Sequence, residues 1–143
     1  MYEHTLVLIK PDAVRRKLIG EIISVYEKNK LDICAIKILH MDREIAEGFY
    51  HVHQGKEFFQ RLINFMVSAP TVVMVIGGED AITRIRAING KTDPKEAGED
   101  TIRGKYALDV TRNSVHASDS PESAASEISY FFPAYKILKY EEE

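Results

Sequence analysis

The sequence has only one cysteine and no excess of basic residues. Cys34 cannot form an internal disulfide, and the apolar run 33–36 around it indicates a side chain that packs as a small hydrophobe. A formal net charge of -3 gives no electrostatic footprint for nucleic acid. We therefore expect neither a disulfide nor a nucleic-acid partner.

Long apolar runs are also missing. No run reaches the length that spans a membrane, and residues 1–4 lack the basic start and apolar stretch of a secretion signal. We expect a cytoplasmic protein with no membrane partner.

What remains is typical of a globular protein. The chain has 143 residues, of which 45% are hydrophobic and 29% charged, which suits one compact domain over residues 1–143 with a real core. It shows no internal repeat and no linker.

Apolar runs and helical spacings alternate along the chain. The runs predict buried strands at 5–9, 31–41 and 71–76; Lys10-Pro11-Asp12 turns the chain after the first, and Gly77-Gly78 breaks the third. Asp42, Asp80 and Ser120 are placed to cap helices. Helices are predicted near 19–26, 42–50, 58–66, 80–90 and 121–132. This alternation indicates an α/β or α+β domain.

Residues 90–112 interrupt the pattern. They are polar, contain Gly90, Pro94, Gly98 and Gly104, and show no clear period. Structureless loops of this length are usually functional or disordered. Gly90-Lys91-Thr92 resembles the end of a Walker A loop, but Ile85 stands where that motif needs glycine, and a helix precedes it instead of a strand.

The segment 113–120 carries one histidine directly before a helix start. Ser120 reads as the N-cap and Pro121 as the first helical residue. Glu127 borders the inward face of that helix, so its carboxylate can fix the tautomer of His116 and leave one ring nitrogen free to attack. The alternatives are a core histidine bonded to an acid and a surface glutamate.

Three cations stand at structurally distinct places. Lys10 follows a buried strand, Arg86 flanks a helical apolar stripe, and Arg103 lies in the long loop. Each alone is most simply a solvated charge. Together they provide the lysine point charge and arginine forks that bind a polyphosphate.

Other ring side chains are weaker candidates. His51 and His53 lie two apart in a probable helix and point to different faces, which argues against a paired metal site. Tyr50 and His53 share a face. Of the adjacent Phe58 and Phe59, we expect one in the core and one free to stack on a ring.

With these residues in place, the chain closely resembles the nucleoside diphosphate kinase family. The resemblance runs from Thr5 to about Phe132 and rests on the segments 9–14, 101–104 and 113–120. It implies a ferredoxin-like four-stranded antiparallel sheet covered by helices. It also implies homo-oligomers built from dimers, either tetramers or hexamers. The C-terminal tail, 133–143, is then either a solvated end or a segment that packs on a neighbouring subunit.

The resemblance implies a ping-pong reaction in which a nucleoside triphosphate, mainly ATP, gives its γ-phosphoryl group to a histidine and a nucleoside diphosphate collects it. His116 would be the nucleophile through Nδ1, oriented by Glu127, with Ser118 supporting Glu127. The other implied positions are Lys10 on the transferring phosphate and the ribose, Tyr50 near the phosphoryl group, Arg86 and Thr92 on the β-phosphate, Arg103 bridging the β- and γ-phosphates, Asn113 on the sugar hydroxyls, and Phe58, Leu62 and Val110 around the base. Mg²⁺ would be the cofactor, held mainly by phosphate oxygens without a dedicated protein site. Stacking between apolar walls implies low base specificity.

The sequence departs from the family at a few small residues. Ala117, Ala69 and Thr111 stand where the family commonly has glycine. Were a positive φ required at position 117, alanine would cost on the order of 1 kcal/mol. A non-catalytic nucleotide-binding module is the competing function, but it would not need a histidine and a glutamate beside three cations.

Overall fold

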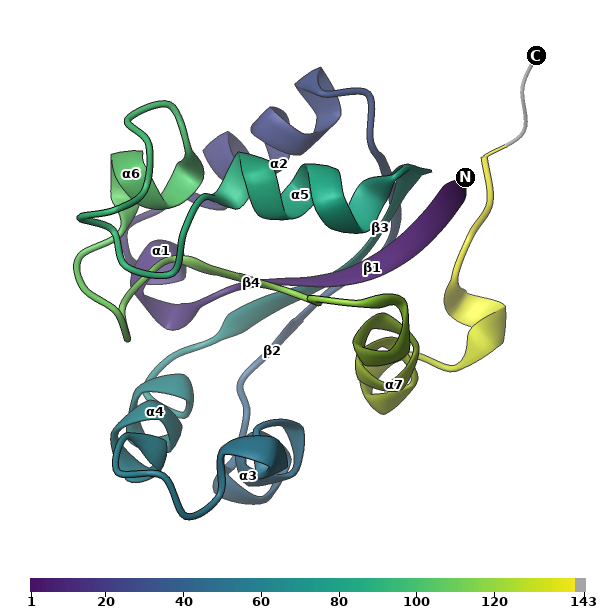
Figure 1. The fold of residues 1–143 in the computed structure, drawn as a ribbon. Helices are drawn as coiled ribbons and strands as arrows, with labels where there is room; N and C mark the ends of the chain where they lie inside the picture. Colours follow the sequence, from purple (N-terminus) through teal and green to yellow (C-terminus); the bar gives the residue numbers. More distant parts are fainter. Residues whose placement is uncertain (141–143) are drawn as a thin grey trace.

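The computed structural model describes residues 1–140 and is built on one antiparallel sheet (Figure 1). Its strands are β1 (Tyr2–Ile9), β2 (Asp32–Leu39), β3 (Thr71–Glu79) and β4 (Val115–Ala117), in the order β2-β3-β1-β4. All three pairings are antiparallel. The ferredoxin-like sheet implied by the resemblance is confirmed.

Helices cover both faces of the sheet (Figure 1). One layer contains α1 (Pro11–Arg15), α2 (Ile19–Lys28), α5 (Ala81–Asn89) and α6 (Ile102–Tyr106). The other contains α3 (Arg43–Phe49), α4 (Phe59–Met66) and α7 (Pro121–Phe131). Short 3₁₀ turns occupy η1 (His51–His53) and η2 (Ala134–Lys136). Among the helices of residues 1–140, none is long and apolar enough to cross a membrane.

The period of two in β1 divides the core between the two layers. Leu6 and Leu8 pack with buried residues of α3, α4 and α7, whereas Val7 and Ile9 pack with those of α2 and α5. Each of these four side chains is fully buried. β1 therefore contributes buried side chains to the core on both faces of the sheet.

The predicted helix caps have different outcomes. Oδ1 of Asp42 accepts a hydrogen bond from Ile45 N at 2.8 Å, and Oγ of Ser120 accepts one from Ser123 N at 3.0 Å, as predicted. The prediction for Asp80 is wrong: this residue adopts a left-handed φ of 51°, and in the described chain its side chain makes no capping bond.

Three predicted boundaries also need correction. Lys10-Pro11-Asp12 does not form an isolated turn but opens α1, with proline at the first helical position. β3 continues through Gly77-Gly78, because both glycines still pair with β1 and leave room for the Tyr2 and Leu31 side chains. The long loop contains α6, whose first turn is capped by Thr101 Oγ1.

The tail lies along the outer edge of β2 in its own chain. Leu138 N donates to Cys34 O at 2.9 Å, and the Tyr140 hydroxyl donates to Ile33 O at 2.6 Å. The three glutamates at 141–143 lie outside the described residues.

Candidate active site

A cleft of about 570 Å³ opens beside the β4 end of the sheet. Its walls come from α3, α4, α7 and the segment 86–113. Every predicted site residue except Ser118 lines it: Lys10, Tyr50, Phe58, Leu62, Arg86, Thr92, Arg103, Val110, Asn113, His116 and Glu127.

His116 sits on β4 and pairs with Leu8 of β1, so its ring faces the α3–α7 layer. Its Nε2 lies 2.9 Å from Oε1 of Glu127 on α7, with the two side chains 23% and 22% exposed. The Phe49 ring packs edge-on at 5.3 Å between centroids. Nδ1 makes no hydrogen bond to any residue of 1–140, so it is the ring nitrogen without a protein partner.

The surroundings hold the imidazole in its neutral form. Burial lowers the pKa of His116 below its ordinary value of 6.5; Glu127 opposes this by hydrogen bond and charge, while Lys10 and Arg103 lower the pKa further. The lowering effects prevail, so the ring carries an available lone pair near neutral pH.

Ser118 lies behind the cleft rather than in it. Its hydroxyl is fully buried, donates to Glu127 Oε1 at 2.9 Å and accepts from Leu6 N at 3.3 Å. This one hydroxyl therefore ties the carboxylate to β1.

Lys10 is buried where β1 meets α1. Its Nζ donates to Oδ1 of Asn113 at 2.9 Å, and Asn113 Nδ2 in turn donates to Thr92 O at 3.2 Å. Burial, helped by the charge of Arg103 and opposed by Asp12, lowers the pKa of Lys10 to about 8.

Arg103 is fixed by two backbone carbonyls. Nη1 donates to Gly90 O at 2.7 Å, and Nη2 donates to Val115 O at 2.8 Å. Its Nε is buried and has no partner within residues 1–140. The guanidinium thus joins the end of α5 to β4, and both Arg103 and Arg86 line the cleft.

Tyr50 and His53 lie together on the opposite wall, as their spacing predicts. Their rings stack with centroids 6.2 Å apart and planes at 27°. The Tyr50 hydroxyl is buried without a partner in the described part of the chain, and burial raises its pKa. It is a protonated donor on a residue that lines the cleft.

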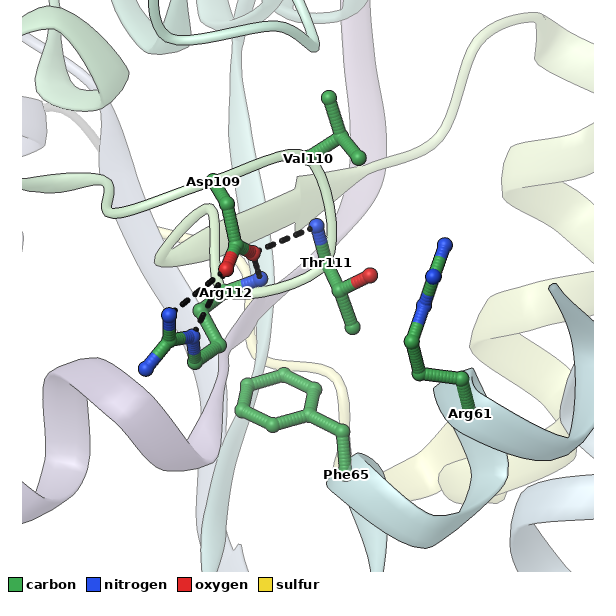
Figure 2. Close-up of a pocket in the computed structure, with 6 residues that line it drawn as sticks. All are labelled: Arg61, Phe65, Asp109, Val110, Thr111 and Arg112. Carbon is green, nitrogen blue, oxygen red and sulfur yellow. Dashed lines mark hydrogen bonds and ion pairs between the residues drawn. The ribbon is translucent and has the colours of Figure 1, made fainter.

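The mouth of the cleft presents apolar surfaces. Phe58 is 38% exposed while Phe59 is buried, which confirms that one ring enters the core and the other stays free. Val110 projects from a turn that is stabilised by Asp109 (Figure 2). The Asp109 carboxylate accepts hydrogen bonds from Thr111 N, Arg112 N and the Arg112 side chain.

The backbone beside the histidine does not penalise alanine. Ala117 is in extended β4, and the left-handed residue is Ser114, with a φ of 73°. Ser114 Oγ donates to Asp12 Oδ2 at 3.1 Å across the base of the site. The expected cost of alanine at position 117 therefore does not arise.

Sequence reasoning missed several residues that shape the site. Phe49, Asp12 and Ser114 act through contacts between distant segments and carry no local signal. Asp109 does carry one, because an aspartate that accepts backbone N–H groups two and three residues later is typical of a turn. Arg61 follows Phe58 by three positions, so helical spacing alone places it near the same mouth.

The cleft has few side chains that could ligate a metal ion. Within residues 1–140 no group of three or more His, Cys, Asp or Glu side chains is arranged to hold an ion. The lining carboxylates are Asp119 and Glu127, and Glu127 is already bonded to His116 and Ser118. This donor set fits a cation that arrives bound to phosphate oxygens.

Comparison with known proteins gives a consistent result. The nucleoside diphosphate kinase family model matches residues 3–137. The nucleoside diphosphate kinase of Methanocaldococcus jannaschii is 54% identical over 138 residues, covering 96% of this chain and 99% of the relative. That of Sulfolobus acidocaldarius is 53% identical over 130 residues, covering 91% and 90%. This chain belongs to the nucleoside diphosphate kinase family.

Solved structures agree. The crystal structure of the Aquifex aeolicus nucleoside diphosphate kinase superposes with a TM-score of 0.94 at 41% identity, covering 96% of this chain and 100% of that one. As a member of the nucleoside diphosphate kinase family, the chain is an enzyme of nucleotide metabolism that transfers phosphate from a nucleoside triphosphate to a nucleoside diphosphate.

Proposed function

We propose that the transfer is a ping-pong reaction through a phosphohistidine at His116. Nδ1 attacks the γ-phosphorus, the bond from that phosphorus to the β–γ bridging oxygen breaks, and the nucleoside diphosphate leaves with the bond's electron pair. A second diphosphate then attacks phosphorus and releases Nδ1. The proton on Nε2 stays in place throughout. The observation that carries the proposal is the 2.9 Å bond from Nε2 to Glu127, which leaves Nδ1 free.

The cations of the cleft bind the phosphates in this proposal. Lys10 and Tyr50 contact the transferring group, and Arg86, Arg103 and Thr92 grip the β- and γ-phosphates. Asn113, already bonded to Lys10, contacts the sugar hydroxyls. Phosphoryl transfer asks the protein mainly for positioning and charge stabilisation, which fixed cations in a largely buried cleft supply.

The base binds at the mouth between apolar surfaces. Phe58 stacks on one face, and Leu62 and Val110 form the other walls. Stacking is available to every base, so base specificity is low. His53 also lines the cleft, next to Tyr50, and we assign it no role.

Mg²⁺ is the proposed cofactor. When bound it neutralises phosphate charge, and it is held mainly by the nucleotide's oxygens. The protein residues that face those phosphates are Lys10, Thr92, Arg86 and Arg103.

Labelled ATP tests the mechanism directly. Incubating the pure protein with γ-labelled ATP and Mg²⁺ should give an acid-labile, base-stable label that moves onto added nucleoside diphosphate. His116→Ala should give none, whereas His51→Ala, at the exposed end of the cleft, should label normally. A label that persists in His116→Ala contradicts the proposal. Nucleotide binding without any label would favour a non-catalytic module.

The organisation of the molecule is part of the same proposal. We expect residues 1–143 to act as one domain in the cytoplasm, within homo-oligomers built from dimers. The part of the edge strand β2 beyond the tail's bonds to Ile33 and Cys34, with Ile36 and Ile38 exposed, is available for subunit contact. Light scattering at several concentrations distinguishes monomer, tetramer and hexamer.

A further inference from the structure

A second hollow of about 330 Å³ adjoins the mouth of the cleft (Figure 2). It is lined by Arg61 and Phe65 of α4 and by the turn 109–112. Arg61, Val110 and Thr111 line both spaces, so the hollow is continuous with the place where the base binds in the proposed function.

Arg61 is an uncompensated cation at this junction. Across residues 1–140 its guanidinium makes neither a hydrogen bond nor an ion pair. Figure 2 shows the side chain rising from α4 beside Thr111, apart from the bonds that join Asp109 to Arg112. The carboxylate of Asp109 is already occupied by Arg112 at 2.8 Å. All donors of Arg61 are therefore available to a ligand.

We propose that Arg61 reads the exocyclic group of the base and favours oxo bases over amino bases. This rests on the proposed function, in which the base lies between Phe58 and Val110. Arg61 follows Phe58 by three residues on the same flank of α4, so its fork reaches the edge of a ring stacked on Phe58.

The chemistry of the guanidinium sets the direction of the preference. Arginine has donors only. Guanine presents the acceptors O6 and N7 together, and uracil and thymine present O4. Adenine keeps N7 but has an amino donor in place of O6, and cytosine has an amino donor in place of O4. At the exocyclic position Arg61 therefore gains a hydrogen bond with guanine, uracil and thymine and meets a second donor on adenine and cytosine.

The size of the preference is limited by exposure. Arg61 lies on the surface, where water competes for the guanidinium. We expect Arg61 to raise two ratios about threefold to tenfold: kcat/KM for GDP relative to ADP, and kcat/KM for UDP relative to CDP. This effect is well below that of a buried arginine fork. General acceptance of all bases is retained.

The test compares four acceptors with one saturating phosphate donor. Arg61→Leu should bring both oxo-to-amino ratios close to one by lowering kcat/KM for GDP and UDP, with ADP and CDP little changed. Arg61→Lys, which keeps the charge without the planar fork, should give an intermediate ratio. IDP, which keeps O6 and lacks the 2-amino group, should behave as GDP does.

Two results would overturn the inference. Equal loss for all four acceptors in Arg61→Leu would mean that Arg61 attracts phosphate by charge alone, and unchanged ratios would mean that it does not contact the base. Phosphohistidine formation from labelled ATP is measured on the same variants. If labelling is intact while the ratios do not move, the Arg61 inference fails alone; if the wild-type protein is not labelled, the proposed function fails.

Discussion

Ser118 and Glu127 are joined by a hydrogen bond at the carboxylate oxygen that also holds His116. The Ser118 hydroxyl donates to Oε1 of Glu127 at 2.9 Å, and Nε2 of His116 lies 2.9 Å from the same atom. Ser118 also accepts from Leu6 N in β1. A central strand therefore positions the histidine through a serine and a glutamate.

Ser118→Ala removes that connection without touching the cleft. We expect the rate of phosphohistidine formation to fall about tenfold, because Glu127 loses a buried donor and orients His116 less well. Rapid-quench labelling measures this step. Ser126→Ala is the matched control, since Ser126 lines the cleft but bonds only within its own helix, to Ser123 O. Equal rates in the two variants would show that the bond does not position Glu127.

The acid side of the pH profile should depend on Glu127. In the proposed reaction His116 attacks as the neutral ring, so labelling should slow as pH falls through its lowered pKa. Glu127 raises that pKa, so Glu127→Gln should move the acid limb to lower pH. The plateau rate should fall by at least about tenfold as orientation is lost. Labelling rates from pH 4 to 8 test this, and an acid limb that moves upward would contradict it.

The alkaline side should depend on Lys10, whose pKa is lowered to about 8. The ammonium is charged below that value and neutral above it, so kcat/KM for a nucleoside diphosphate should decline as pH rises through about 8. Lys10→Arg should be slower but should lack this decline, because a guanidinium stays charged. A decline of the same shape in Lys10→Arg would assign it to another group.

Unfolding does not explain such a decline. The ordinary pKa of a lysine is 10.5, so between about 8 and 10.5 the unfolded chain binds more protons at Lys10 than the folded protein. The contribution of this residue to the free energy of unfolding therefore rises with pH in that window. Thermal melts from pH 7 to 10 separate the two effects.

Gly104 should be intolerant of substitution. A β-carbon there would overlap the backbone carbonyl of Gly98, so Gly104→Ala must displace α6 and the adjacent Arg103. We expect a loss of about 1–3 kcal/mol in the free energy of unfolding and a decrease in kcat/KM of more than about tenfold. Gly20→Ala is the control, because nothing lies within 4 Å of the added atom. Normal kcat/KM in Gly104→Ala would show that α6 does not set Arg103.

Local sequence signals predicted the elements that local chemistry determines. Ser120 and Pro121 begin α7 as expected, and the continuous apolar run 5–9 forms the buried part of β1. α6 was missed because it has five residues, only Ile102 is buried, and a glycine lies within it. Asp80 was assigned a capping role that its left-handed backbone does not allow.

Residue type and position indicated the histidine, the acid and the cations as candidates, whereas the family resemblance supplied their roles and the remaining site positions. The sequence could not reveal that Ser114 bonds Asp12 across 102 residues, because only the fold brings them together. Helical spacing could have placed Arg61 near the mouth, but not the turn 109–112 that lines the same hollow from the other side. Which residues far apart in the sequence contact one another cannot be read from the sequence, although their chemical types can.

The groups of the site that are bonded to β1 are held more rigidly than the mouth of the cleft. His116 pairs with Leu8, Ser118 bonds Leu6, and Lys10 follows the strand directly. A strand paired on both sides opens only when most of the domain opens, so these groups keep one geometry over time. The mouth, in contrast, is formed by Phe58 at a helix end and Val110 on a turn, which yield more easily. In the proposed function, nucleotides with bases of different size are then accommodated at the entrance, while the phosphates meet the same fixed groups.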